Sequence, residues 1–211
     1  GAWYNGQQPE NTGVEPVMIV NKEYFVSVNG VMQRTWSTAD LPKSIDWANN
    51  LGIRIVNLSL GVHNGIPEVD MLAIKNAIDN IIDNNDAVVI ASAGYSPAPS
   101  SNPGIAFPAS YEPVVAVGGA NESNQRHMLS PYGNELDLVA PYSMMTNQGC
   151  TLYGIDPDFQ ISWSNGTSCS AAAVSGIVGL MLSANPCLTS KEIKECLYAS
   201  CYKSPTYTYE N

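Results

Sequence analysis

The sequence predicts an α/β fold with a mostly parallel open sheet that is covered by helices on both faces. Three short runs of apolar, often β-branched residues, at 53–60, 87–93 and 114–117, each end at a glycine. Such runs are typical of strands buried on both faces, because helices cover both sides of a parallel sheet. Between the first two runs, apolar residues recur at the spacing of a helix. This alternation of strand and helix patterns indicates right-handed crossovers in one open sheet.

The segments before and between these runs have the spacing of helices. Residues 44–50, which follow Pro42, predict a short helix. Residues 69–84 predict a longer helix, because its large apolar side chains recur on one face: Met71, Ile74, Ile78, Ile81 and Ile82. We expect both helices to cover the sheet with their apolar faces.

The C-terminal part of the chain predicts one more strand and two helices. Residues 136–140 predict a strand that ends at a proline. Residues 168–184 are nearly all apolar, which predicts a helix that is buried on every side. Thr189 and Glu192 have the spacing of a capping box, in which each side chain satisfies an amide of the first turn. This pair predicts a last helix that ends near Ala199.

Length and composition limit the domain organisation and the location. The chain has 211 residues and an apolar fraction of 45%, which suits one domain with a substantial core. We therefore expect a single domain over residues 1–211, with a flexible tail at 203–211. A charged fraction of only 13% favours a secreted or cell-surface protein.

Charge and hydropathy exclude two kinds of partner. The formal net charge is −10, with 9 Lys and Arg residues, whereas binding of nucleic acid needs clustered cations that displace counterions. No signal-peptide pattern opens the chain, and no apolar run approaches the length of a bilayer span. We therefore expect neither nucleic acid nor a membrane as a partner.

The five cysteines lack the paired short spacings of a metal site, and we expect neither a metal nor another cofactor. Cys187, Cys196 and Cys201 lie close together in the sequence and can supply one disulfide in an oxidising compartment, with the pairing left open. Cys169 is flanked by small residues, which is typical of a packed thiol. The fifth cysteine is Cys150.

The ends of the predicted strands indicate where a functional site lies. Open α/β sheets bind ligands beyond the carboxyl ends of their strands, where Ser59-Leu60-Gly61, Ser92-Ala93-Gly94 and Ser168 are all expected. A serine at a helix N-terminus also has amides and the positive end of the helix dipole beside it, which favour an oxyanion in acyl transfer. Gly-Thr-Ser before a helix is most often a simple cap, so this chemistry alone leaves both interpretations open.

A specific resemblance includes the same serine. Asn165-Gly166-Thr167-Ser168, with Val174 and Gly176 at the right spacing, resembles the nucleophile motif of the subtilisin-like serine proteases, or subtilases. Further segments resemble the same family in the same order, namely 56–61, 92–94, 107–111, 115–118, 124–126 and 135–141. The resemblance covers most of the chain from about Ser44 to Tyr198, and the ordered set of segments is far more specific than one motif.

The resemblance implies a role for each matching position. Ser168 matches the nucleophile, which implies peptide-bond hydrolysis through an acyl-enzyme without a metal or organic cofactor. The segments Ser59–Gly61 and Ser92–Gly94 match those that hold a peptide substrate in extended form. A peptide or a protein is therefore the implied substrate or ligand.

The chain departs from the family pattern in three ways. Tyr95 stands where the family places an asparagine that donates to the oxyanion, and loss of that donor in a subtilisin costs about a hundred- to a thousand-fold in rate. Ala172 and Ala173 replace the family's Pro and His inside the helix. The Asp and His motifs that precede the substrate segments in the family are both missing, and a serine without a base is a poor nucleophile. We expect His63 and His127, which match neither motif, to be solvated loop residues.

These departures leave two functional interpretations. In the first, the chain is the serine-bearing portion of a subtilisin-like endopeptidase whose Asp and His lie upstream or on another chain. In the second, it is a pseudoprotease that binds peptide or protein at the Ser59–Gly61 and Ser92–Gly94 segments without cutting it, and a relic without any ligand is a third possibility. A sheet that lacks the Asp- and His-bearing strands has an unpaired edge, which predicts pairing with a second copy or with the missing N-terminal segment.

Overall fold

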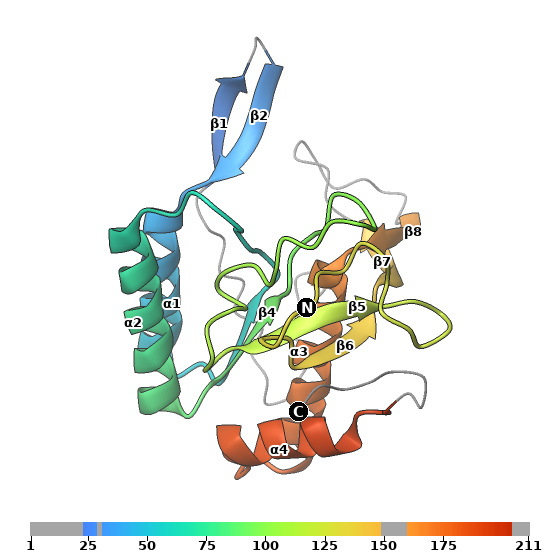
Figure 1. The fold of residues 1–211 in the computed structure, drawn as a ribbon. Helices are drawn as coiled ribbons and strands as arrows, with labels where there is room; N and C mark the ends of the chain where they lie inside the picture. Colours follow the sequence, from blue (N-terminus) through green and yellow to red (C-terminus); the bar gives the residue numbers. More distant parts are fainter. Residues whose placement is uncertain (1–22, 29–30, 149–159, 204–211) are drawn as a thin grey trace. The chain divides into compact units, whose positions relative to one another are not determined.

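The structure, a computed structural model, describes residues 23–28, 31–148 and 160–203, and Figure 1 draws its helices and strands. The chain divides into two compact units. The first contains Gly1–Val56, Gly65–Val89 and Gly176–Cys196, and the second contains Asn57–Asn64, Ile90–Ser175 and Leu197–Asn211. A single domain over residues 1–211 stays a prediction, and most of the expected tail, 204–211, lies outside the described residues.

The main sheet is parallel where its register is described, which confirms the predicted α/β class. It has four strands in the order β3-β4-β5-β6, which are Ile55–Leu58, Val88–Ser92, Val115–Ala120 and Leu138–Pro141. Strand β4 pairs with β5 and β5 pairs with β6, both in parallel. Every residue of β4 is buried, which explains why its sequence is apolar without alternation.

Helices α1 (Leu41–Asn50) and α2 (Glu68–Asn85) belong to the first unit and lie side by side in Figure 1. Helix α1 follows a short 3-10 turn at Thr38–Asp40 and has a proline in its first turn, where a missing amide costs little. Both helices bury one apolar face, made of Leu41, Ile45 and Ala48 in α1 and of Ile74, Ala77, Ile78 and Ile81 in α2. The apolar face predicted for residues 69–84 is confirmed at Ile74, Ile78 and Ile81.

Two antiparallel hairpins lie outside the predicted elements. One joins β1 (Glu23–Val28) to β2 (Val31–Trp36), and the other joins β7 (Ser143–Gln148) to β8 (Gln160–Asn165). The sequences of the second hairpin, SMMTNQ and QISWSN, are largely polar and give no signal of a buried strand. Strand β8 nevertheless positions the site, because it leads directly into the turn before Ser168.

Helix α3 (Thr167–Ala184) starts within one residue of its predicted position, but the prediction that it is buried on all sides is wrong. Its side chains Val174 and Val178 are at most 2% exposed, whereas Ile177 is 48% and Leu180 is 71% exposed. By length and composition alone, its 18 residues also suffice to cross a membrane, contrary to our expectation for the chain. Because one side of α3 packs in the protein core, this helix is best described as a core helix with one uncovered side.

Helix α4 (Ser190–Ser200) begins at the predicted capping box. The amide of Thr189 donates to Glu192 Oε2 at 2.8 Å, and the amide of Glu192 donates to Thr189 Oγ1 at 3.2 Å. These hydrogen bonds, first of all the one from the Thr189 amide, hold the pKa of the Glu192 carboxyl below its usual value. The sequence pattern thus identified both the start of the helix and the contacts that fix it.

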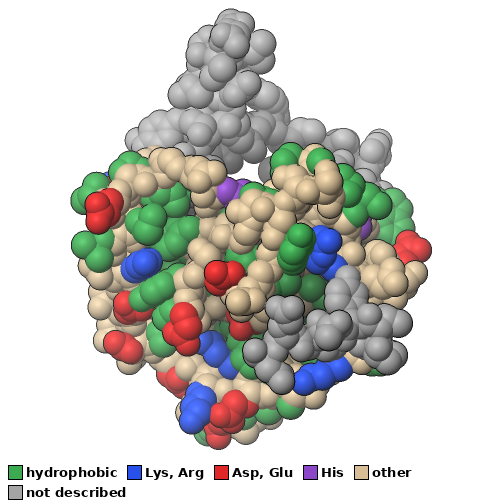
Figure 2. All heavy atoms as spheres, viewed as in Figure 1, with side chains coloured by type: hydrophobic (Ala, Val, Ile, Leu, Met, Phe, Trp, Pro, Cys, Tyr) green, Lys and Arg blue, Asp and Glu red, His purple; other side chains and the backbone are tan. Residues whose placement is uncertain are grey.

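The net negative charge is spread over the face of the molecule that Figure 2 shows. On that face, Asp and Glu side chains are separated from one another, and Lys and Arg side chains lie among them.

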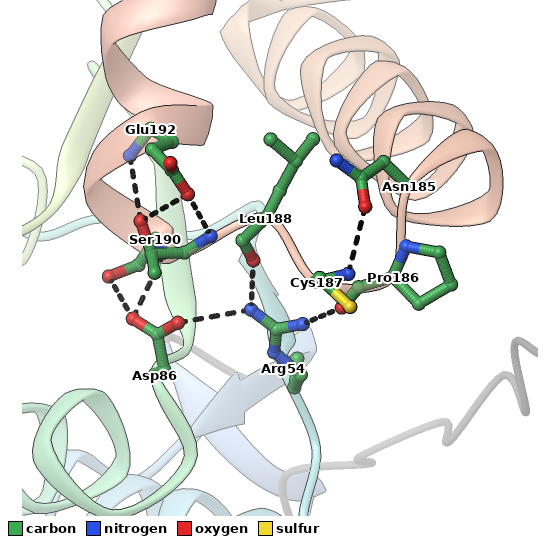
Figure 3. Close-up of polar contacts among 9 residues, drawn as sticks. Arg54, Asp86, Asn185, Pro186, Cys187, Leu188, Ser190 and Glu192 are labelled. Atoms are coloured by element: carbon green, nitrogen blue, oxygen red, sulfur yellow. Dashed lines mark hydrogen bonds and ion pairs between the residues drawn. The ribbon is translucent and has the colours of Figure 1, made fainter.

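An ionic network in the first unit ties together the end of α2, the start of β3 and the start of α4 (Figure 3). Arg54 donates to the carbonyl of Pro186 at 2.9 Å and to that of Leu188 at 2.5 Å, and lies 3.2 Å from Asp86 Oδ2. Asp86 follows α2 in the left-handed conformation, with φ 52°, and its Oδ1 accepts the amide and the hydroxyl of Ser190 at 3.0 and 2.6 Å. Arg54 and Asp86 therefore hold the loop before α4 in place.

The contacts of Asp86 change its titration. Burial raises the pKa of its carboxyl, but the hydrogen bonds from Ser190 and the charge of Arg54 outweigh this effect, and the pKa lies below its ordinary value of 3.8. The folded state therefore favours the ionised carboxylate, so the network adds stability wherever Asp86 is charged.

We expect Asp86→Asn to lower the free energy of unfolding at pH 7 by about 1 kcal/mol, a value that allows for the partial exposure of the pair. Asparagine tolerates the left-handed conformation, so the change removes the charge and spares the backbone. The contribution of Asp86 is complete above pH 3.8 and is lost as the pH falls through its lowered folded-state pKa, so the parent and the variant should converge there. Urea unfolding at several pH values measures this difference. Asp83→Asn, an exposed change on the same helix, is the control, and an equal loss in both variants would contradict the role of the network.

Candidate active site

The structure brings together the strand ends that the sequence singled out, all within the second unit. Ser92 Oγ donates to the carbonyl of Leu60 at 3.3 Å, which joins the segment Ser59–Gly61 to the segment Ser92–Gly94. The amide of Ala93 continues the sheet by donating to the carbonyl of Val117 at 2.9 Å. Gly94 then contacts the turn that precedes Ser168. The predicted convergence of these segments at one sheet edge is confirmed, while their roles stay predictions.

Thr167 joins the serine turn to the end of β4. Its hydroxyl donates to the carbonyl of Gly94 at 2.8 Å and accepts the amide of Gly94 at 3.2 Å. The side chain is buried, at 4% exposed, so water does not compete for either bond. Gly166, with φ 133°, is in a conformation that favours glycine, and its amide donates to the carbonyl of Tyr142 at 2.9 Å. The backbone on the N-terminal side of Ser168 is therefore fixed on two sides.

Ser168 lies in the first turn of α3 with its side chain exposed. Its Oγ donates to the carbonyl of Ser59 at 3.1 Å, and Ser59 Oγ donates back to the carbonyl of Ser168 at 2.8 Å. The helix N-terminus favours negative charge at this position. A carbonyl oxygen accepts a hydrogen bond but does not take the proton, so this contact orients the hydroxyl without activating it.

Two residues that sequence analysis missed support this pair of serines. Asn57 Nδ2 donates to Ser59 Oγ at 3.0 Å, and Ser175 Oγ donates to Asn57 Oδ1 at 3.2 Å. Asn57 is exposed between the buried residues Val56 and Leu58 of β3, so strand alternation directs it away from the core. That alternation was the available signal, since a polar residue inside a buried strand marks the functional face.

His63 is packed against the end of β4 rather than solvated. Gly94 has φ 102°, and a Cβ at this position would lie 2.7 Å from His63 Nε2, so the ring occupies space that only a glycine leaves. Nε2 accepts the amide of Tyr95 at 3.4 Å, which assigns the proton of the neutral ring to Nδ1. Nδ1 is buried and has no hydrogen-bond partner among the described residues. Nothing in the sequence indicated this contact.

Tyr95, at the position of the family's oxyanion donor, is 53% exposed. Burial, followed by the electrostatic effects of Tyr95 and Cys169, raises the pKa of Tyr142 above its usual value. The Tyr142 ring in turn stacks on His127, with 3.7 Å between centroids and 4° between planes. His127 is therefore a partly buried residue held by ring stacking, and the described contacts of both histidines are packing contacts.

The cysteines and possible metal ligands add no chemistry to the described part of the site. Cys169 is half-buried and lies 3.2 Å from Ser164 Oγ, as expected for a packed thiol. Cys187, Cys196 and Cys201 are free thiols in the structure, without the disulfide that their spacing permits, and Cys150 lies outside the described residues. Among the described residues, no three His, Cys, Asp or Glu side chains are placed to hold a metal ion.

Comparison with known proteins gives a consistent set of relatives. The model of the family described as "Subtilase family" matches residues 6–208. The chain is 30% identical to Subtilisin E of Bacillus subtilis (strain 168), in a match that covers 88% of this chain and 44% of that protein. It is 33% identical to Subtilisin DY of Bacillus licheniformis, in a match that covers 72% of this chain and 51% of that protein. The solved structure of the prenylagaramide maturation protease PagA matches with a TM-score of 0.64 and 25% identity, over 83% of this chain and 62% of that one. The chain thus spans about half the length of these curated relatives.

We expect Thr167→Val to lower the free energy of unfolding by about 1–3 kcal/mol, because the isosteric change removes the hydroxyl and leaves the amide and the carbonyl of Gly94 without their partner. Urea unfolding at neutral pH measures the loss. The control is Thr167→Ser, which keeps the hydroxyl and should retain most of the stability. Equal destabilisation by both variants would mean that the methyl group, and not the pair of hydrogen bonds, matters at this position.

Proposed function

We propose that this chain, which belongs to the subtilase family and carries a subtilisin-like peptidase domain, is the serine-bearing portion of an endopeptidase. This endopeptidase cuts peptide or protein chains. Ser168 attacks the scissile carbonyl and forms an acyl-enzyme, which water then hydrolyses. The observation that carries this proposal is the place of Ser168, exposed in the first turn of α3 and bonded to the end of β3. Its proposed location is outside the cell, which the low charged fraction of 13% supports.

The two strand ends give the substrate a place beside Ser168. The segments Ser59–Gly61 and Ser92–Gly94 are bonded to each other through Ser92 and Leu60, and each contacts the serine turn. An extended peptide binds at such sheet ends through its main chain, and pockets for its side chains then give specificity. In this proposal, the peptide lies along these two segments with its scissile carbonyl at Ser168 Oγ.

The proton of Ser168 needs an acceptor from another polypeptide segment. In the described structure the hydroxyl donates to the carbonyl of Ser59, and the chain's two histidines, His63 and His127, are held in packing contacts. We propose that an upstream segment supplies a histidine and an aspartate. The histidine takes the proton during attack and returns it to the leaving amine, and the aspartate holds the imidazole in the right tautomer.

A second candidate function is peptide binding without cleavage, and Tyr95 favours it. An added segment can restore a base, but it cannot restore the asparagine that donates to the oxyanion. A tyrosine hydroxyl donates from a different distance, and in this chain the amide of Tyr95 is bonded to His63. Under this alternative, the same strand ends bind a peptide, and Ser168 takes no part in chemistry.

Labelling with a fluorophosphonate separates the two functions. We expect no rapid adduct on the 211-residue chain alone, and a Ser168 adduct on the longest polypeptide that its gene encodes around it, because only the latter contains the proposed base. Intact mass and peptide mapping locate the adduct, and Ser168→Ala is the control. Absence of an adduct on the longer protein would leave peptide binding as the function.

Within the longer protein, we expect Tyr95→Asn to raise the rate of peptide hydrolysis about tenfold or more, since it restores an oxyanion donor whose loss costs at least that much. Initial rates on a denatured protein substrate measure the change. Tyr95→Phe, which removes the hydroxyl without adding a donor, is the matched control and should show no increase. A slower Tyr95→Asn enzyme would mean that the phenol itself contributes to catalysis.

A further inference from the structure

The ring of His63 lies against the end of the segment Ser92–Gly94, two residues after the segment Ser59–Gly61 ends. A Cβ on Gly94 would lie 2.7 Å from Nε2 and 2.9 Å from Cε1 of this ring. The same Cβ would lie 2.9 Å from the Cβ of Ala106. The absence of a side chain at Gly94 thus leaves a space at the strand end, and the imidazole and one methyl group lie in it.

The neighbours of His63 hold the ring at this place, and all of them belong to the second unit. The amide of Val62 donates to the carbonyl of Phe107 at 2.8 Å, and the amide of Phe107 donates to the carbonyl of Val62 at 3.0 Å. Phe107 belongs to the core, at 9% exposed. The amide of Tyr95 donates to Nε2 of the ring at 3.4 Å. Turning the ring away from Gly94 would break this last hydrogen bond.

A substrate side chain that enters beside Gly94 meets the imidazole. Successive side chains of an extended peptide point to opposite sides, so those on one side face the protein and need space there. Beside Gly94, that space contains the ring of His63 and the methyl group of Ala106, a residue that is fully buried. Closely packed groups accommodate an added large side chain poorly. The ring therefore limits the size of the side chain that the peptide can place there.

We propose that His63 sets the substrate specificity of the site by its volume. The site accepts glycine, alanine or serine at the peptide position that faces Gly94, and it rejects large aliphatic and aromatic residues at that position. This inference rests on the proposed function, because it names the substrates of the same site. Among the groups in contact at Gly94, His63 has the largest side chain, since Ala106 contributes only a methyl group.

The imidazole also has a polar group, which the test separates from its volume. Nδ1 carries the proton of the neutral ring, is buried and has no hydrogen-bond partner among the described residues. An acidic side chain of a substrate offers an acceptor, but it would first have to displace the atoms that bury Nδ1. The volume of the ring acts without such a rearrangement, because the ring already lies against Gly94.

The test uses the longest polypeptide that the gene encodes around the 211-residue chain, with a denatured mixture of proteins of known sequence as substrate. Mass spectrometry of the fragments identifies the residues on both sides of each cleaved bond. At one position before the scissile bond, we expect glycine, alanine and serine to be enriched about tenfold or more over leucine, methionine and phenylalanine.

Two variants of His63 separate volume from hydrogen bonding. We expect His63→Ala to reduce this enrichment to about threefold or less at that position alone, because the variant removes the ring. His63→Phe is the matched control: it keeps a ring of similar size without the nitrogens, and it should retain the preference for small residues. Thermal unfolding shows whether each variant is folded, and His63→Ser replaces His63→Ala if the latter is not.

Three results would overturn the proposal. The first is a parent enzyme without a size preference, and the second is an unchanged preference in folded His63→Ala or His63→Ser. The third is loss of the preference in His63→Phe as well, which would assign the effect to the nitrogens of the ring. Enrichment of aspartate and glutamate by the parent, lost in His63→Phe, would likewise assign His63 to the recognition of acidic substrates.

The failure of this inference is distinct from the failure of the proposed function. Cleavage without a size preference overturns the role of His63 and leaves the peptidase standing. If the longer protein cuts nothing, the peptidase is overturned, and binding of the same variants to an array of peptides with every residue at every position tests the size limit. An array preference for small residues that His63→Ala loses and His63→Phe keeps would support the role of His63, and its absence would overturn it.

Discussion

The site depends on the two hydrogen bonds between the Thr167 hydroxyl and the backbone of Gly94. They join the last residues of a buried strand to the first turn of α3, and they leave both polar groups of Gly94 satisfied at the edge of the core. The contacts of Ser168 and of Tyr95 lie directly beside these two hydrogen bonds. Ser168, the residue after Thr167, donates to the carbonyl of Ser59, and Tyr95, the residue after Gly94, donates its amide to His63.

Close packing at the strand ends explains the small residues of the sequence. A Cβ on Gly61 would lie 2.8 Å from the Cβ of Ala106, and one on Gly94 would lie 2.9 Å from the same atom. The two segments are therefore packed onto one methyl group, and any larger side chain would push them apart. The glycines that end the first two apolar runs are required because the segments Ser59–Gly61 and Ser92–Gly94 both pack against Ala106 in the same small space.

Local patterns in the sequence predicted most of the fold and part of the site. Strands β3 to β6 and helices α1 to α4 follow from residue periodicity and caps, and the convergence of Ser59, Ser92 and Ser168 follows from the rule for parallel sheets. The hairpin β7–β8 did not follow, because its strands are polar and their pairing is not local information. The packing of His63 did not follow either, since it depends on space at Gly94 that only the folded chain reveals.

The uncovered side of α3 has a different cause. The composition of a helix indicates whether its sides favour burial. Whether each side is buried depends on which other parts of the polypeptide pack against it. Ser168 lies at the N-terminus of the helix that has Ile177 and Leu180 on its uncovered side. Under the proposed function, a base supplied to Ser168 would still leave Tyr95 where the family places its oxyanion donor, so stabilisation of the oxyanion rather than activation of the serine would limit the rate of such an enzyme.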